Sequence, residues 1–367
     1  MKLSIERNAL LKALGHVQNV VERRNTIPIL SNVLLTAQDN MLTFVATDLD
    51  IEVAEDTAAE ISAPGQVTAP AHTLYDIARK LPDGSQVVLQ INAEERLDVD
   101  AGRSHFTLPL LPSGDFPKMT ADGFTHNFSM PASALRRLID KTRFAISTEE
   151  TRYYLNGIYM HAHNKVLRCV ATDGHRLALA ESELPAGADG LPGIIIPRKT
   201  VTEIRRLIDG LDADVTLSLS DAKIRFTVGS AVLTSKLIDG TFPDYERVIP
   251  KGNEKELTID IKVFADAVDR VATISAEKSR SIKMALSADS LALSVNNPES
   301  GNAHEDLRVD YSADPLEIGF NAKYLLDVAN QVEGRDATFW LDSPASPALV
   351  KDSEDENSLF VLMPLRV

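Results

Sequence analysis

Apolar residues at helical spacing follow directly on short alternating segments at the start of the chain. After the alternating positions that begin at Leu3, the residues Leu10, Leu11 and Leu14 share one face of a helix. This strand-to-helix phrase occupies three places one third of the chain apart, at residues 3–14, 128–139 and 257–268. A second such phrase lies midway through each third, at residues 67–78, 194–205 and 316–327. The pattern predicts a threefold repeat with two helices in each third.

The segments between these helices have the pattern of antiparallel hairpins. They are short runs rich in Val, Ile, Leu, Thr and Phe, separated by turn residues, as in residues 30–36 and 41–47. Each half of a third then reads as a strand, a helix and three more strands, which predicts an α+β fold. Polar, glycine-containing segments near residues 125 and 253 suggest the boundaries. We expect three repeated domains at residues 1–125, 126–253 and 254–367.

Charge is distributed unevenly among the three predicted domains. The 367 residues carry a net charge of −15, which argues against holding a nucleic acid by wholesale phosphate neutralisation. The three predicted domains carry −7, +2 and −10. The middle domain has 17 of the 38 cations, concentrated on its helices, including Arg136, Arg137, Lys141 and Arg143. These helices offer either a solvated face with ordinary ion pairs or a functional surface.

Several classes of protein are excluded by composition. A single cysteine, Cys169, rules out a disulfide framework and a Cys-rich zinc site. Glu6 and Arg7 stand where a signal peptide would be apolar, and no run approaches 18 apolar residues. We therefore expect a cytoplasmic protein that does not bind a membrane. The chain has no Gly-rich phosphate loop, and we expect no cofactor.

Three local patterns carry candidate chemistry. Asp173, His175 and Arg176 could form an acid/base pair with an anion clamp, although Asp-Gly is also a turn signal. His161 and His163 could face a metal from one side of a strand, but no third ligand accompanies them. Arg152, Tyr153 and Tyr154 suit a stacking or phosphate contact and suit the edge of a core equally well.

Seven segments stand in order along the chain: VERRNTIPILSNVLL at 21–35, RYYLNG at 152–157, ATDGHRLA at 171–178, IIPRK at 195–199, SKLIDGTFPDYERVIP at 235–250, EIGFNAKYLLDV at 317–328 and MPLR at 363–366. Through these segments the chain resembles the bacterial sliding clamp family, the β subunits of DNA polymerase III, over its whole length. The resemblance implies a non-catalytic processivity factor of DNA replication. It also implies a head-to-tail homodimer whose six domains close into a ring around double-stranded DNA, independent of DNA sequence.

The resemblance assigns three sets of residues. The implied DNA contacts are Arg24, Arg152, Tyr153, Tyr154, Arg198 and Lys199. A hydrophobic pocket for short linear motifs maps to Tyr154, Leu155, Thr172, Gly174, His175, Arg176, Leu177, Pro243, Arg247, Val248, Asn321, Tyr324, Ser346, Val361, Met363, Pro364, Leu365 and Arg366. In this pocket we expect His175, Arg176 and Arg366 to form the polar rim. The implied dimer interface includes Arg103, Thr273, Ile274 and Glu299.

The family also implies partners for that pocket: the α subunit of DNA polymerase III, the clamp loader, translesion polymerases, mismatch-repair proteins and DNA ligase. The chain departs from the family pattern at Ser279, where many members have an aromatic residue, and at Glu149, where the enterobacterial pattern has Gln. The acidic cluster expected near Glu299 is also thinned. Two alternatives to a clamp stay open at this point: a repeat-built enzyme that uses Asp173 and His175, and a peptide-binding scaffold that does not bind DNA.

Overall fold

The computed structural model describes residues 1–120, 123–275 and 280–366, so Ser279 lies outside the described residues. The chain forms two compact units, each described by itself. The first unit comprises Met1–Ser133, Pro185–Ala188 and Lys199–Leu237. The second comprises Ala134–Leu184, Asp189–Arg198 and Ile238–Val367.

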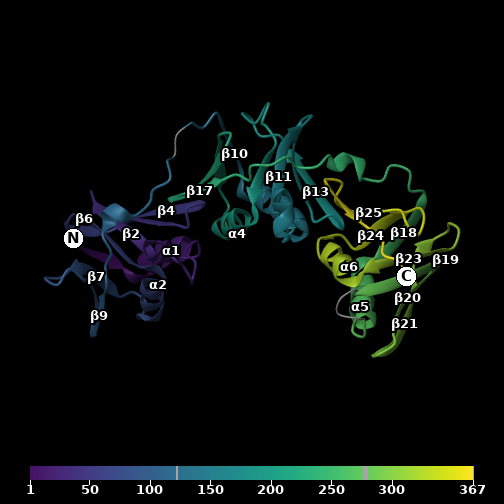
Figure 1. The fold of residues 1–367 in the computed structure, drawn as a ribbon, viewed down its shortest axis with the longest axis horizontal. Coiled ribbons are helices and arrows are strands. Elements are labelled where there is room, and N and C mark those ends of the chain that lie inside the picture. Colours follow the sequence, from purple (N-terminus) through teal and green to yellow (C-terminus); the bar gives the residue numbers. More distant parts are fainter. Residues whose placement is uncertain (121–122, 276–279, 367) are drawn as a thin grey trace. The chain divides into compact units, whose positions relative to one another are not determined.

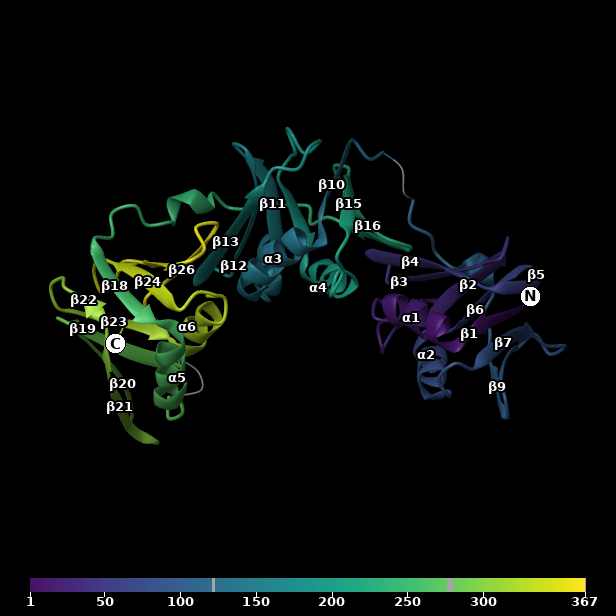
Figure 2. The same cartoon turned by 180° about the vertical axis from the view of Figure 1, so that it is seen from behind.

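Each third of the chain contains a strand, a helix, a group of strands, a second helix and three more strands (Figures 1 and 2). The group between the two helices has four strands in the central third and five in the other two. The N-terminal third contains β1 (Lys2–Glu6), α1 (Arg7–Val17), β2 (Asn32–Gln38), β3 (Met41–Thr47), β4 (Ile51–Ala58), β5 (Glu60–Ala63), β6 (Gly65–Pro70), α2 (Ala71–Lys80), β7 (Gln86–Ile91), β8 (Leu97–Ala101) and β9 (Ser104–Leu108). The central third contains β10 (His126–Pro131), α3 (Ala132–Thr142), β11 (Gly157–His163), β12 (Val166–Thr172), β13 (Arg176–Glu183), β14 (Ile194–Pro197), α4 (Arg198–Leu207), β15 (Asp214–Leu219), β16 (Lys223–Val228) and β17 (Ala231–Lys236). The C-terminal third contains β18 (Lys255–Asp260), α5 (Ile261–Ala272), β19 (Ser281–Ser287), β20 (Ser290–Asn297), β21 (Gly301–Arg308), β22 (Asp310–Tyr311), β23 (Leu316–Asn321), α6 (Ala322–Ala329), β24 (Asp336–Leu341), β25 (Ala348–Asp352) and β26 (Ser358–Leu362).

All six predicted strand-to-helix phrases are confirmed, since each helix begins at the residue after a strand ends. Side chains at three of these junctions cap the helix by accepting a hydrogen bond from its first turn. Glu6 accepts from the N–H of Ala9, Asp260 from Val263, and Asn321 from Lys323. Such caps satisfy N–H groups that have no partner inside the helix. The other three strands end at a proline, which does not continue the strand ladder.

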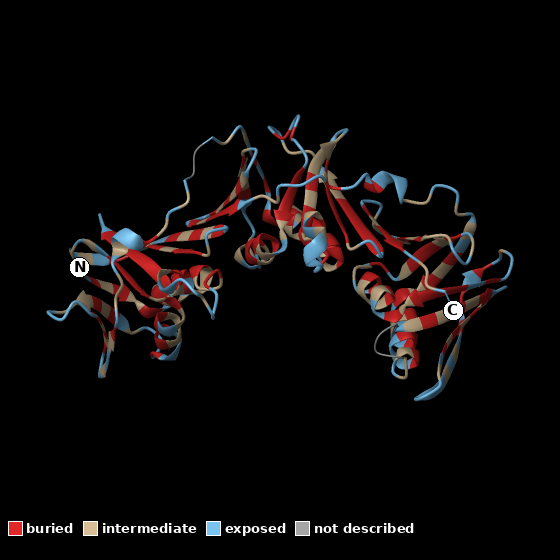
Figure 3. Cartoon of the chain, viewed as in Figure 1, coloured by how far each residue is buried: buried red, intermediate tan, exposed pale blue. Residues whose placement is uncertain are grey.

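The apolar faces of the helices lie against the sheets. In α5 the buried residues Ile261, Phe264, Val268 and Val271 recur at helical spacing. Figure 3 shows the same division along many strands, where buried positions alternate with intermediate or exposed ones. Within the N-terminal third α1 packs beside α2, and within the C-terminal third α5 packs beside α6. The α+β prediction is therefore confirmed.

Two of the sheets continue from one third of the chain into the next. In the eight-stranded sheet β17 pairs with β4, where Leu233 lies opposite Val53. In the nine-stranded sheet β13 pairs with β26, where Leu177 lies opposite Val361. All strand pairings in the described residues are antiparallel. Adjacent thirds are thus joined by backbone hydrogen bonds as well as by the chain itself.

Candidate functional site

An apolar cluster lies where β13 meets β26 in the second unit. Leu155, Leu177 and Val361 are buried in it, and Tyr154 packs against it. These are four of the residues assigned to the pocket. Val248 and Met363, also assigned, keep 48% and 39% of their surface exposed. Single exposed apolar side chains are common on protein surfaces. It is the assignment of Val248 and Met363 to one pocket that makes this part of the surface a candidate for binding an apolar ligand.

The segment 172–176 forms a tight turn beside this cluster. The hydroxyl of Thr172 accepts from the N–H of Gly174 at 3.1 Å and donates to the carbonyl of Arg176 at 2.7 Å. The carboxylate of Asp173 accepts from the N–H groups of His175 and Arg176 at 2.9 and 3.0 Å. Gly174 has φ +87°, a conformation that favours glycine. Because the carboxylate of Asp173 accepts from backbone N–H groups and from the side chain of Arg176, the turn explains this motif better than an acid/base pair does.

Arg176, which we expected on the polar rim, lies mostly beneath the surface but lines the same polar cavity as His175. The residue is only 7% exposed, and its guanidinium forms a short ion pair with Asp327 and donates to the carbonyl of Phe144 at 2.6 Å. The guanidinium also lies over the ring of Tyr324, 4.4 Å from its centroid. Burial of a charge requires such partners. Arg176 therefore supports the turn from beneath, while His175 and Arg366 remain exposed.

The C-terminal tail connects this turn to the C-terminal third. The N–H of Met363 donates to the carbonyl of His175 at 2.9 Å, and that of Leu365 donates to Gly319 at 2.8 Å. Asn321 caps α6, and the ring of Tyr324 stacks on His175 with centroids 6.3 Å apart. Of the remaining assigned pocket residues, Pro243 and Arg247 lie at the short helix Tyr245–Arg247, and Ser346 bonds to Asp342 at 2.8 Å. Pro364 lies between the two tail contacts.

The six implied DNA contacts are divided between the two units. Arg152, Tyr153, Tyr154 and Arg198 belong to the second unit, and the rings of the two tyrosines meet edge to face at 5.8 Å. Arg198 begins α4 and lines a polar cavity of about 340 Å³ together with Glu149 and His175. Arg24 and Lys199 belong to the first unit, where Arg24 is exposed in a loop.

Two of these cations are already paired with carboxylates. The guanidinium of Arg152 contacts Glu149 at 2.8 and 2.6 Å. The ammonium of Lys199 contacts Asp48 at 2.6 Å, forms a short ion pair with Glu22, and donates to the carbonyl of Val20 at 3.0 Å. Burial opposes the charge of Lys199, but the hydrogen bonds to Asp48 and Glu22 outweigh it and raise its pKa. Lys199 thus fixes a loop of the first unit in addition to any contact with a ligand.

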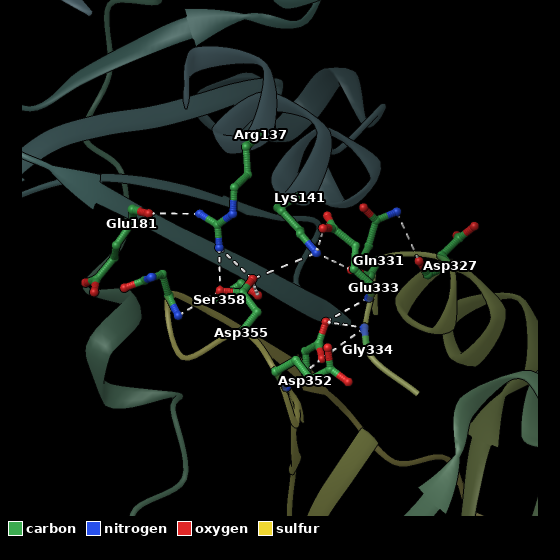
Figure 4. Close-up of polar contacts among 12 residues, drawn as sticks. Arg137, Lys141, Glu181, Asp327, Gln331, Glu333, Gly334, Asp352, Asp355 and Ser358 are labelled. Atoms are coloured by element: carbon green, nitrogen blue, oxygen red, sulfur yellow. Dashed lines mark hydrogen bonds and ion pairs between the residues drawn. The ribbon is translucent and has the colours of Figure 1, made fainter. Parts of the chain in front are cut away.

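The cations on α3 prove to be partly structural. Figure 4 shows Arg137 and Lys141 reaching from this helix toward Asp355, whose carboxylate lies 2.6 and 2.5 Å from Arg137 and 3.8 Å from Lys141. Lys141 also pairs with Glu333 at 2.9 Å. For Arg137 and Lys141 the structure favours ordinary ion pairing over a ligand-binding surface, because both link the central third to the C-terminal third.

The implied dimer residues lie near two exposed sheet edges. Arg103 is exposed in the turn between β8 and β9, and β9 is an edge of the five-stranded sheet. Thr273 and Ile274 follow α5, and the carbonyl of Ile274 accepts from the amide of Asn297 at 2.9 Å. Glu299 is exposed just before β21, an edge of the four-stranded sheet. The edges present backbone groups that can pair with another chain.

The remaining candidates do not form a metal site. In the part of the chain that the structure describes, no three His, Cys, Asp or Glu residues are grouped to hold a metal ion. His161 instead stacks on Tyr159 and bonds to the hydroxyl of Tyr245 at 2.9 Å, and burial lowers its pKa. Burial also raises the pKa of the Cys169 thiol to about 12. None of the described helices has the length and apolar character needed to cross a membrane.

The repeat, the shared sheets and the apolar cluster define a binding protein built from repeated domains. Three family models match it in order: the N-terminal domain of the DNA polymerase III beta subunit at residues 1–120, the central domain at 129–244 and the C-terminal domain at 246–366. The beta sliding clamp of Caulobacter vibrioides NA1000 is 60% identical over 372 aligned positions, covering 100% of both chains. This chain belongs to the beta sliding clamp family, whose members are non-catalytic processivity factors of DNA polymerase III.

Solved structures agree with this assignment. A Caulobacter crescentus beta sliding clamp, with polyethylene glycol bound to a putative beta-motif tethering region, is 60% identical with a TM-score of 0.97, covering 100% of this chain and 99% of that chain. The DNA polymerase III subunit beta sliding clamp of Bartonella birtlesii, bound to griselimycin, is 51% identical with a TM-score of 0.97, covering 100% of both chains. The fold and the general role in DNA replication are therefore confirmed, and the enzyme alternative is wrong.

Sequence reasoning missed the carboxylates that hold the implied site. Glu149 and Arg152 stand three residues apart, a spacing that in a helical turn brings side chains together, so this pair could have been found. The partner of Arg176 could not have been found in this way, since Asp327 is 151 residues away. The same holds for Lys199 and Asp48.

Proposed function

We propose that two copies of this chain associate head to tail into a ring that encircles double-stranded DNA. The observation that carries this proposal is the pair of exposed sheet edges, β9 in the first unit and β21 in the second. Pairing β9 of one copy with β21 of the other would continue both sheets, as β17 with β4 and β13 with β26 do within the chain. The domains in this proposal are residues 1–125, 126–253 and 254–367.

The ring would hold DNA by topology rather than by affinity. A net charge of −15 is unfavourable for tight binding to phosphates. A few contacts to the DNA backbone, from Arg24, Arg152 and Arg198 with Tyr153 and Tyr154 beside them, would position the ring without reading the sequence. Lys199 would also contact the DNA backbone while it stays paired with Asp48 and Glu22. Such a protein would act in the cytoplasm, where bacterial DNA lies.

The apolar cluster would receive short peptide segments of proteins that act on DNA. Leu155, Leu177 and Val361 are buried in one cluster, while Val248 and Met363, which the same pocket assignment includes, are exposed. Apolar side chains of this kind suit one or two apolar anchors of a peptide. Methionine can repack around different side chains, which suits several partners. The partners that this proposal names are the α subunit of DNA polymerase III, the clamp loader, translesion polymerases, mismatch-repair proteins and DNA ligase.

Retention on circular DNA tests the ring. Clamps loaded onto nicked circular DNA by a clamp loader should stay bound through gel filtration, and they should be lost once a restriction enzyme linearises the circle. Topological binding ends at a free DNA end, whereas electrostatic binding does not. Equal retention on both templates would contradict encirclement. Failure to be retained on the circle would favour a peptide-binding scaffold that does not hold DNA.

A further inference from the structure

We propose that Glu149 is an internal competitor for phosphate, which occupies the guanidinium of Arg152 and keeps DNA binding weak and only slightly dependent on salt. The inference rests on the proposed function, because it assumes that Arg152 contacts the DNA backbone. It assigns a role to an acidic residue placed within the implied DNA-binding loop.

The backbone of Glu149 is fixed on both sides. Its N–H donates to the hydroxyl of Ser147 at 3.1 Å, and its carbonyl accepts from the side-chain amide of Asn156 at 3.1 Å. Glu149 precedes the short helix Glu150–Leu155, in which Arg152 has the non-helical angles φ −111° and ψ 50°. The carboxylate is therefore positioned by the fold of the loop, three residues from the guanidinium that it meets.

Glu149 occupies the edge of Arg152 that a phosphate would need. Nε donates to one carboxylate oxygen at 2.8 Å and Nη2 to the other at 2.6 Å, and Nη2 also donates to the carbonyl of Asp173 at 2.9 Å. Nη1 lies against Gly174, where an added Cβ would approach it to 2.4 Å. Arginine binds phosphate best through two parallel N–H groups. A phosphate can gain this fork only by displacing Glu149.

The pair is accessible, and its surroundings are basic. The side chains of Arg152 and Glu149 are 31% and 51% exposed, so a DNA backbone could reach them. The cavity that Glu149 lines also contains Arg198, Lys323 and His175. Its other carboxylate, Asp173, is bound to the turn and to Arg176. The hydrogen bond from Arg152 lowers the pKa of Glu149, so this carboxylate stays charged near neutral pH.

This exchange of partners has a thermodynamic signature. When a free cation binds a phosphate, the DNA releases a counterion, and each such contact steepens the dependence of log K on log salt by about 0.9. When the cation must first leave a carboxylate, the freed carboxylate attracts a cation in its place and cancels much of this gain. A weak contact of this kind suits a ring that slides.

The test is a double-mutant cycle on DNA affinity in the full-length protein. Anisotropy of a fluorescein-labelled DNA duplex, titrated at several NaCl concentrations, gives affinity and salt slope for wild type, Glu149→Gln, Arg152→Gln and the double variant. We expect Glu149→Gln to tighten binding about threefold at low salt, the size of an exposed ion pair. We also expect its salt slope to steepen by about 0.9, and both effects to vanish when Arg152 is replaced.

The control is Glu317→Gln, which removes the same charge from another exposed pair, Glu317 with Lys283 at 2.7 Å. An equal gain in this control would overturn the inference, because net charge alone would then explain the result. If Arg152→Gln weakens DNA binding and Glu149→Gln has no effect, the inference fails and the proposed function stands. If neither variant changes binding, Arg152 does not contact DNA and the inference fails, while retention on circular DNA still tests encirclement separately.

Discussion

Asp355 shows how one carboxylate can fix two cations of a distant helix. It accepts from Arg137 and lies near Lys141, and it also accepts from the hydroxyl of Ser358 at 2.7 Å. Lys141 is almost fully buried, with its side chain 3% exposed. A buried cation without its partner is costly. At the residue scale Asp355, through Arg137, and Glu333, through Lys141, therefore both join the central third to the C-terminal third (Figure 4).

We predict that Asp355→Asn lowers the free energy of unfolding by about 2 kcal/mol at pH 7, since it removes a charge-assisted pair from a largely buried site. The measurement is urea unfolding followed by circular dichroism. As a control, Asp310→Asn changes an exposed acid on the edge strand β22 and should shift stability by less than about 0.5 kcal/mol. Equal stability of Asp355→Asn and wild type would contradict the structural role.

The same variant makes a prediction about pH. Burial of Asp355 opposes its ionisation, but the hydrogen bonds from Arg137 and Ser358 outweigh this effect and lower its pKa. A carboxyl whose pKa is lower in the folded protein stabilises the fold above its unfolded pKa of about 3.9, and this contribution is lost as pH falls through the folded value. The stability difference between wild type and Asp355→Asn should therefore be largest near neutral pH and shrink progressively below about pH 4.

At the scale of elements, the short C-terminal tail connects strand β26 to the turn at His175 and to strand β23. Strand β26 ends at Leu362, and the tail then bonds to the turn at His175 and to β23 at Gly319. Three different elements therefore meet through four described residues, 363–366. The exposed side chain of Met363 lies on this connection rather than inside the core.

Deletion of residues 363–367 should lower the affinity of a clamp-binding peptide at least tenfold, because about 1.4 kcal/mol of apolar contact is lost. Fluorescence anisotropy of a labelled peptide measures this affinity. The single variant Met363→Ala separates the side chain from the tail and should lose part of the affinity with little effect on thermal stability. The mass of the assembly in solution should not change. Unchanged peptide affinity after the deletion would contradict the pocket assignment.

At the scale of the whole molecule, assembly depends on the two exposed sheet edges. Arg103 lies beside β9, and Ile274 and Glu299 lie near β21. Of the acids in this region, Glu305 is already paired with Arg270 at 2.5 Å within the chain. Fewer carboxylates are then available for a second copy. Apolar contacts around Ile274 would carry a larger share of the interface.

We predict that Ile274→Asp converts the dimer into a monomer, because it places a charge at an apolar contact. Native mass spectrometry should give a mass near 40.1 kDa for this variant and about twice this value for wild type. The variant should also fail to stay on nicked circular DNA while its peptide affinity is unchanged. Val263→Asp, at an exposed position on α5, adds the same charge and should remain dimeric. A monomeric wild type would contradict the ring.

The sequence by itself determined the threefold repeat, the six strand-to-helix junctions and the antiparallel strands. These features depend on local rules, since helical spacing, caps and strand alternation act over a few residues. The turn at Asp173 was also one of the two interpretations that the sequence allowed, the other being an acid/base pair. Glu149 and Arg152, which form an ion pair, also stand at the three-residue spacing from which such a pair can be predicted.

Only the tertiary structure decided which charged residues are structural and which are exposed. It buried Arg176 against Asp327, paired Lys199 with Asp48, and attached α3 to Asp355. It also joined β13 to β26, which assembles the apolar cluster from residues of the central third and the C-terminal third. These contacts link residues that are far apart in sequence, and their energies depend on burial and on partners that no local pattern contains.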